Sequence, residues 1–383
     1  MYILKAELNK IISMPMMWAA LAICFVLNIG IVFLYQQKIV DYPYFSYVTD
    51  TLSITGNMLG NNFSEKLSAM PNSAEKKRLI LETKNSMPIF KDYDTGKLAD
   101  AYIGVYGISG MGADLLQAKY KKLKAAVKRL NQEKAEFALY SAGITVQMHN
   151  LLFGVILRAV ITECCILAVL IMLYLYGYEY QNKTEFTVYT TKIGRGIYKY
   201  KFAVGIISSV ICFILIASFT LYIYFSVFDY SQLWSANVSS GFNYISEMIG
   251  IKPFITWMPF TVRKYLFATL GLGLALTLVF AIMGAFIGFL VRNNYIGVLL
   301  FFMIALAMMS VPYMFSKAEI WSGYLLLQFT PVCLWFSQPE WFTDMGSVSV
   351  IPFHETAGII FNVLFWVILL LIAWRYVKRK DVA

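Results

Sequence analysis

The residue types that perform chemistry in proteins are sparse in this chain of 383 residues, and they do not form a catalytic pattern. The two histidines, His149 and His354, are far apart in the sequence. The five cysteines lie in or beside hydrophobic runs, at Cys24, Cys164, Cys165, Cys212 and Cys333. Because these spacings match neither a metal-ligand set nor a disulfide framework, we expect no metal site and no catalytic residues.

A phosphate-binding loop of the form G-x-x-x-x-G-K-[ST] does not occur in the sequence. The nearest fragment, "DTGKLAD", lacks the upstream glycine and the Ser or Thr after Lys97. ATPases of this type need both parts, because the loop surrounds the phosphates and the hydroxyl holds Mg²⁺. We therefore predict that the chain binds no cofactor, has no ATPase site of its own and is not an enzyme.

Two ionisable residues, Arg158 and Glu163, lie inside the apolar run "NLLFGVILRAVITECCILAVLIMLYLY". A charge at the centre of a membrane helix costs ~2.5–3.5 kcal/mol, so such residues usually face protein or water. Their spacing puts them ~140° apart on a helix, so we expect no direct pair. Two interpretations stay open: a polar patch on a translocation path, or structural interhelical bonds, with Arg158 reaching outward to the membrane surface.

The elements that position these residues are membrane spans. With 59% hydrophobic and 14% charged residues, the chain is too apolar for an ordinary soluble protein. Its fold class is predicted as an all-α integral membrane protein with six transmembrane helices, at 17–36, 151–177, 202–228, 266–291, 295–315 and 357–374. The first run is too long for a cleavable signal peptide. A seventh run at 323–336 is too short to span and contains Pro331, so it is predicted as a re-entrant part of 316–356.

The distribution of Lys and Arg predicts the orientation. Twelve of them fall in the segments 1–16, 178–201, 292–294 and 375–383, whereas four fall in 229–265 and 316–356. By the positive-inside rule the first set of segments and both termini are cytoplasmic, and the second set is extracytoplasmic. This asymmetry explains most of the net charge of +10 without nucleic-acid binding.

Residues 1–16 have apolar side chains on one helical face and lysines on the other, which is typical of a helix lying in the membrane surface. Residues 37–150 are predicted to form a mainly helical extracytoplasmic domain. One helix follows the capping residues Asn72 and Ser73, and another follows the glycine-rich stretch "GVYGISGMGADLL". The second helix is amphipathic, is broken at Lys134 and has a basic face that either meets anionic lipid or an acidic peptide or is simply solvated.

The two glycines of "GAFIG", Gly284 and Gly288, have the spacing that permits close approach of membrane helices. The segment "YEYQNKTEFTVYTTKIGRGIYKYK" at 178–201 holds five basic and two acidic residues. Asn182 and Glu185 form a capping-box pattern and Gly194 supplies a left-handed stop, so a helix of two to three turns is expected. Because a plain connector needs only ~2–8 residues, this helix is either a docking surface or part of a solvated loop.

Together, "ILKAELNKI", six spans, "EYQNKTEFTVYTTKIGRGIYKYK" and "LLLQFTPVCLWF" resemble the permease subunit of an ABC-2 type ATP-binding-cassette exporter. The long insert at 37–150 resembles that of bacterial branches with an extracytoplasmic domain between spans one and two, including antimicrobial-peptide export and immunity systems. The abundance of Ile, Lys, Asn, Tyr and Phe suits a low-GC bacterium.

The resemblance implies a multi-pass protein of the bacterial cytoplasmic membrane that exports an amphipathic peptide, lipid or drug. A separate nucleotide-binding ATPase subunit would carry the ATP and Mg²⁺, and a second permease copy or a homologous permease would complete the transporter. The segment 178–201 would contain the coupling helix. Its contacts with the ATPase would come from Thr184, Glu185, Phe186, Tyr189, Lys192 and Arg195.

Two other classes of function fit the composition. A secondary transporter or channel usually carries several ionisable sites in its spans, whereas only the second span does so here. A membrane-anchored sensor would use the domain at 37–150 to bind a ligand and would not need six spans.

Overall fold

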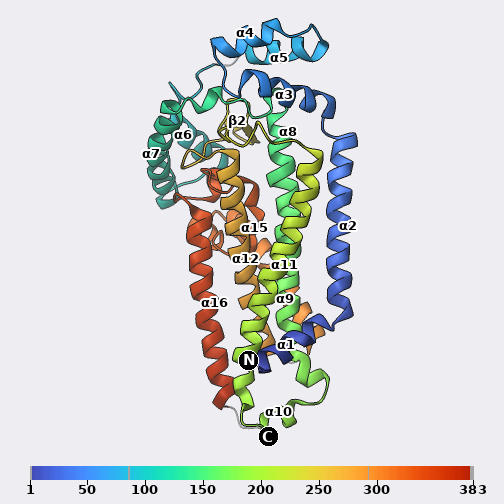
Figure 1. The fold of residues 1–383 in the computed structure, drawn as a ribbon. Coiled ribbons are helices and arrows are strands. Elements are labelled where there is room, and N and C mark those ends of the chain that lie inside the picture. Colours follow the sequence, from blue (N-terminus) through green and yellow to red (C-terminus); the bar gives the residue numbers. More distant parts are fainter. Residues whose placement is uncertain (1, 85–86, 292, 380–383) are drawn as a thin grey trace.

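The computed structural model describes residues 2–84, 87–291 and 293–379, in which long helices stand side by side in an elongated bundle (Figure 1). Six helices in this part of the chain are long and apolar enough to cross a membrane. They are α2 (Pro15–Lys38), α9 (Leu157–Gln181), α11 (Ile197–Val227), α12 (Val262–Leu290), α13 (Asn294–Lys317) and α16 (His354–Arg379). The six predicted spans are therefore confirmed as helices, and the protein is a multi-pass, mainly α-helical membrane protein.

The two ends of the bundle differ. One end, called the insert end below, carries the helices of residues 37–150 and several irregular segments (Figure 1). The opposite end, called the α10 end, carries the short helix α10 (Glu185–Tyr189) and both ends of the chain. Arg292 and residues 380–383, to which the charge analysis assigned part of the loop and tail charge, lie outside the described residues.

Helix α9 lies at the centre of the bundle, between α11 and α12. A Cβ atom on Gly284 would lie 3.0 Å from the Val169 Cα atom, and one on Gly288 would lie 2.7 Å from the Tyr176 Cβ atom. Larger residues at these two positions would push α12 away from α9. The predicted role of the two glycines in close helix packing is therefore confirmed.

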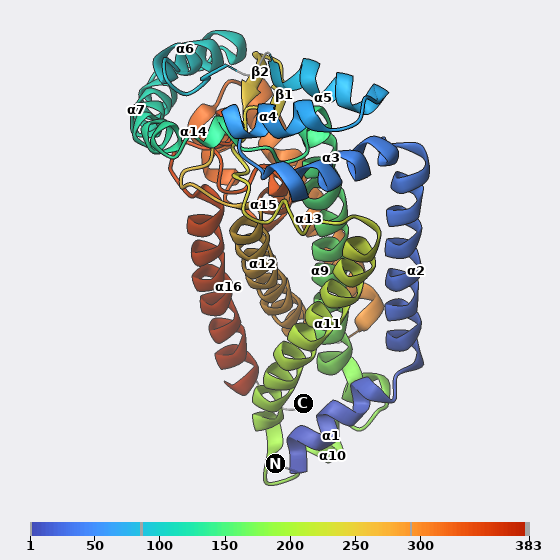
Figure 2. The same ribbon diagram turned by 45° about the horizontal axis from the view of Figure 1, so that its top comes forward.

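The chain before the first span forms α1 (Tyr2–Ile12), which lies across the α10 end of the bundle (Figure 2). Pro15 is the first residue of α2, a position at which a missing backbone N–H removes no helical hydrogen bond. The Trp18 indole donates a 2.8 Å hydrogen bond to the Ile12 carbonyl across this bend. The predicted separate N-terminal helix is thus present.

The insert contains α3 (Tyr42–Thr55), α4 (Asn61–Ala69), α5 (Ala74–Lys84), α6 (Thr95–Tyr106) and α7 (Met111–Gln132). The Ser73 hydroxyl accepts a 3.0 Å hydrogen bond from the Lys76 backbone N–H, so the predicted cap is confirmed at Ser73. Lys134 has a φ of 51°, which ends the helical path at the predicted break. The predicted glycine-rich loop is too long, because Gly104 lies inside α6 and only residues 107–110 separate α6 from α7.

A continuous helical run leads from the insert into α9, through a 3-10 turn (Ala142–Ile144), α8 (Thr145–His149) and a π-helix (Asn150–Ile156). The loop between α11 and α12 contains an antiparallel hairpin, β1 (Tyr244–Glu247) and β2 (Gly250–Pro253), which the all-α prediction omitted. The predicted re-entrant segment consists of α14 (Trp321–Leu327) and α15 (Pro331–Phe336). Both are too short to span a membrane.

Replacement of Gly288 by Val tests the packing of α12 on α9. The new side chain would clash with the Tyr176 Cβ atom, so we expect the free energy of unfolding to fall by about 1–3 kcal/mol. Gly271→Ala is the matched control, because nothing lies within 4 Å of a Cβ atom added at that position of the same helix. Thermal unfolding in a mild detergent would measure both variants. Wild-type stability of Gly288→Val would contradict the close contact.

Candidate functional site

The segment that was predicted to dock a partner contains a shorter helix than expected. Helix α10 spans Glu185–Tyr189, and Thr184 precedes it without a side-chain cap. Asn182 does not cap α10, because its side-chain amide donates a 2.9 Å hydrogen bond to the Tyr178 carbonyl at the end of α9. The expected capping box and the two to three turns are therefore wrong. Gly194 does adopt a left-handed φ of 50° and begins a 3-10 turn, Gly194–Gly196.

The six residues assigned to this docking surface fall into two groups. Thr184, Phe186 and Lys192 are exposed, and the Phe186 ring has 64% of its surface accessible. The other three residues contact the rest of the chain: Glu185 is buried, Tyr189 and Arg195 are half-buried.

Contacts of the second group hold the loop against neighbouring helices. The Tyr189 and Tyr198 hydroxyls lie 2.8 Å apart, which joins α10 to the start of α11. The Arg195 guanidinium donates a 2.6 Å hydrogen bond to the Val377 carbonyl near the end of α16. The loop between α9 and α11 is therefore fastened at both sides, whereas most of its residues between 181 and 193 are exposed, with Phe186 as the most exposed large apolar side chain of α10.

A cluster of four charged residues, called the base network below, connects three helices beneath this loop. Glu179 of α9 accepts hydrogen bonds from Lys201 of α11 and, at 2.8 Å, from Lys10 of α1. Lys10 also pairs with Glu7 at 2.5 Å. Burial would lower the pKa of Lys10, but Glu179 and Glu7 hold this pKa above its usual value. Because buried charges are costly without partners, the base network favours an arrangement in which α1, α9 and α11 stay in contact.

Arg158 and Glu163, the two ionisable residues of the second span, do not pair with each other, as their spacing predicted. The Asn28 amide donates hydrogen bonds to Glu163 at 2.9 Å and to Thr220 at 3.0 Å, so this polar group connects α2, α9 and α11. Arg158 instead lies over the rings of Trp335 and Phe336 of α15, 4.8 and 5.2 Å from their centroids. The two residues therefore belong to different contacts at different depths.

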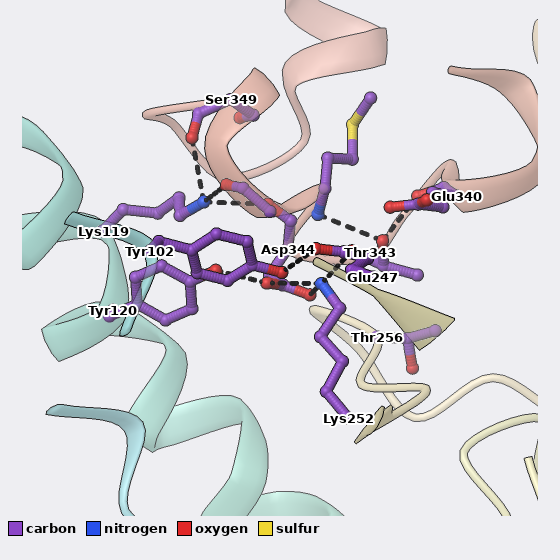
Figure 3. A network of polar contacts seen from close by, with 12 residues as sticks. Tyr102, Lys119, Tyr120, Glu247, Lys252, Thr256, Glu340, Thr343, Asp344 and Ser349 are labelled. Atoms are coloured by element: carbon purple, nitrogen blue, oxygen red, sulfur yellow. Dashed lines mark hydrogen bonds and ion pairs between the residues drawn. The ribbon is translucent and has the colours of Figure 1, made fainter. Parts of the chain in front are cut away.

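A second buried network lies at the insert end (Figure 3). It contains Tyr102, Lys119, Tyr120, Glu247, Lys252 and Asp344, and is called the insert network below. Lys252 of β2 pairs with Asp344 at 3.0 Å and with Glu247 at 3.0 Å. The Tyr120 hydroxyl donates a 2.6 Å hydrogen bond to Asp344. These contacts fasten α7 and the β-hairpin to the segment that precedes α16.

Lys119 makes the most complete contact in the insert network. Its ammonium group donates hydrogen bonds to three carbonyls, those of Asp344 at 2.9 Å, Gly346 at 2.5 Å and Ser349 at 2.8 Å. This lysine satisfies all three of its donors with backbone groups of one loop. The predicted basic face of α7 is confirmed by its exposed residues Lys121, Lys122, Lys124, Lys128 and Arg129. Lys119, in contrast, is buried.

The charged groups of the insert network change one another's pKa values. Burial alone would raise the pKa of Asp344, but the Lys252 and Lys119 ammonium groups hold it below its usual value. Burial would likewise lower the pKa of Lys252, and Asp344 and Glu247 hold it above its usual value. Glu340, which lies beside the insert network (Figure 3), is only partly compensated: burial raises its pKa to about 7, although the Lys252 ammonium group opposes the shift, and the Glu247 and Asp344 carboxylates add to it.

Sequence reasoning missed both networks. Glu179 and Lys201 were counted as loop residues, although each lies within about one turn of the α9 or α11 end that faces the loop. The pairing of a carboxylate and a lysine at facing ends of consecutive spans is a signal that could have found them. The insert network gives no such signal, because Lys119, Lys252 and Asp344 are far apart in the sequence.

Within the described residues no cluster of His, Cys, Asp and Glu side chains could hold a metal ion, and all five cysteines are free thiols. The fold and the two networks define a multi-pass membrane protein in which buried charges join α1, α9 and α11 at one end and fix α7, the β-hairpin and an irregular segment at the other. No protein-family model matches the sequence, and no curated protein and no solved structure is significantly similar to the chain.

Replacement of Glu340 by Gln tests the electrostatics of the insert network. The Glu340 carboxyl loses its proton near pH 4.5 in an unfolded chain and near pH 7 in the folded one. Between these values the unfolded chain binds fewer protons, so raising the pH from about 5 to about 8 should lower the free energy of unfolding by up to about 3 kcal/mol.

Gln does not titrate, so the stability of Glu340→Gln should fall less over this pH range than that of the wild type. Thermal unfolding in detergent would measure both proteins. Asp100→Asn, at an exposed position of α6, is the control and should follow the wild type. An identical pH dependence in Glu340→Gln and the wild type would contradict the raised pKa.

Proposed function

We propose that this chain is the permease subunit of an ABC-2 type exporter of the bacterial cytoplasmic membrane. In this proposal the α10 end faces the cytoplasm and the insert end lies outside. A separate ATPase subunit supplies the energy, a second permease copy or a homologous permease completes the pathway, and the cargo is an amphipathic peptide, lipid or drug. The observation that carries the proposal is an exposed aromatic side chain, Phe186, on a short helix that follows α9, close to the point where buried charges join α9 to α1 and α11.

This arrangement suits the transmission of force. A large exposed ring at the tip of a loop is the kind of residue that fills a pocket on a partner and dominates binding. The loop itself cannot swing freely, because Arg195 fastens it to α16 and Tyr189 fastens it to α11. A displacement of α10 by a partner is therefore passed to the helices.

The base network then distributes the displacement. Lys201 and Glu179 join α11 to α9, and Lys10 joins α1 to the same carboxylate. Separation of α11 from α9 would leave the buried Lys201 ammonium group without its carboxylate, which costs about 3–5 kcal/mol. ATP-driven closure of the ATPase pair would in this way reach the centre of the bundle through α9.

Replacement of Phe186 by Ala tests the docking surface. We expect the affinity for the ATPase subunit to fall by at least about tenfold, because a central aromatic anchor is lost. The variant should unfold at the wild-type temperature, since the ring contributes little to the interior. Met248→Ala is the control, because Met248 is 77% exposed at the opposite end of the molecule. Co-purification with the ATPase and stimulation of ATP hydrolysis would measure the effect, and full activity of Phe186→Ala would contradict the proposal.

The proposed orientation has its own test. Cysteine introduced at Phe186 or at Met248 would be accessible to a membrane-impermeant maleimide, because both side chains are exposed. In intact cells we expect labelling of Met248→Cys and none of Phe186→Cys, with the second site labelled only after the membrane is opened. A variant with the native cysteines replaced gives the background. Labelling of Phe186→Cys in intact cells would place α10 outside and remove the basis for the proposed coupling.

A further inference from the structure

The second span carries a permanent positive charge at Arg158. The Arg158 side chain is half-buried, and among the described residues no carboxylate lies within ion-pair distance of it. Its guanidinium lies over the Trp335 and Phe336 rings, which attract a cation but do not neutralise it. Because an arginine does not lose its proton in a protein, this charge favours an anion from outside the chain.

The depth of Arg158 indicates where that counter-charge lies. Arg158 is the second residue of α9, and Gln181 ends the helix at the α10 end. At 1.5 Å per residue the two are about 35 Å apart along the axis, slightly more than the ~30 Å hydrocarbon core of a bilayer. With the charges of the base network at one membrane surface, Arg158 therefore lies near the opposite surface, where its long side chain can reach the lipid phosphates on the insert side.

A hollow of about 550 Å³ opens beside Phe336, between α13 and the short helices α14 and α15. This volume lies within the range of ligand pockets, ~300–1,000 Å³. Its lining along α13 extends from Leu306 to Ser316, which is about 15 Å of helix axis. That length equals about half the thickness of the hydrocarbon core, so the hollow reaches from the membrane surface to its middle.

The chemistry of the lining changes along this length. One wall of this hollow, called the groove below, is apolar and contains Leu306, Met309 and Pro312. The lining also includes the polar side chains of Ser316 and Gln328. Phe336 links the groove to the cation, because it lines the hollow and lies beneath the Arg158 guanidinium. An acyl chain fits the apolar wall, and a phosphate fits the guanidinium, which can donate two parallel hydrogen bonds to it.

We propose that Arg158 and the groove between α13 and α15 form a binding site for an anionic phospholipid of the leaflet on the insert side. The phosphate pairs with Arg158, and one acyl chain lies along Leu306 to Ser316. This site goes beyond the proposed export activity and does not depend on it.

The test uses the purified full chain in phosphatidylcholine vesicles that contain a fixed minor fraction of one lipid with brominated chains. That lipid is either phosphatidylglycerol or phosphatidylcholine, and bromine quenches the fluorescence of nearby tryptophans. The signal of Trp335, obtained by difference from Trp335→Phe, reports on lipid beside Arg158. In the wild type we expect the apparent affinity for brominated phosphatidylglycerol to exceed that for brominated phosphatidylcholine by about threefold or more. The reason is the charge-assisted contact between the anionic lipid and Arg158.

Arg158→Gln should abolish this preference, whereas Arg158→Lys should retain most of it. Lys264→Gln is the matched control, because Lys264 is an exposed cation near the same end of another span and does not line the groove. Ser310→Phe, which fills the groove from the exposed face of α13, should lower quenching by both brominated lipids.

Equal quenching by the two brominated lipids in the wild type would overturn the proposal, as would an unchanged preference in Arg158→Gln. Unchanged quenching in Ser310→Phe would overturn the placement of the chain in the groove. If Arg158→Gln fails to fold, the proposal is still decided by the lipid preference of the wild type and by the quenching in Ser310→Phe. None of these measurements involves an ATPase subunit, so their failure is distinct from failure of the proposed coupling.

Discussion

The close contact between α9 and α12 is the constraint on which the rest of the structure depends. Gly284 lets α12 approach the α9 backbone at Val169, and Gly288 makes room for the Tyr176 side chain, so α9 and α12 pack closely along the bundle. Helix α9 then carries polar groups at three heights: Glu179 at the α10 end, Glu163 deeper in the bundle and Arg158 at the insert end. Each of these groups faces a different neighbour, so the position of one helix sets the partners of all three.

The two ends of the bundle use buried charge for different purposes. At the α10 end, one carboxylate joins two lysines from different helices, beneath a loop whose residues are mostly exposed. At the insert end, Lys119 and Lys252 bind backbone carbonyls and carboxylates of segments that lack regular structure. The first network joins helices, while the second joins irregular loops to α7 and the β-hairpin. In the proposed exporter, the first network would pass a displacement of α10 to the helices while the second keeps the insert end assembled.

The middle of the bundle contains few polar groups, which agrees with the cost of charge in lipid. There, Glu163 accepts a hydrogen bond from Asn28. Closer to the insert end, the Arg158 guanidinium contacts aromatic faces. In the proposed lipid site, a phospholipid at the outward faces of α13 and α15 would supply the negative charge.

The sequence by itself determined the class of protein, the six spans, the separate N-terminal helix, the break at Lys134 and the close packing at Gly284 and Gly288. These features follow from apolar length, helical periodicity, proline and glycine, which act over short stretches of chain. It did not determine the length of α10, where Asn182 completes the end of α9 instead, or the partners of Arg158 and Glu163. It also did not distinguish the buried Lys119 from the exposed lysines of α7. Only the tertiary structure decided these points, because a buried charge is stabilised by groups that are distant in the sequence and come together when the helices pack.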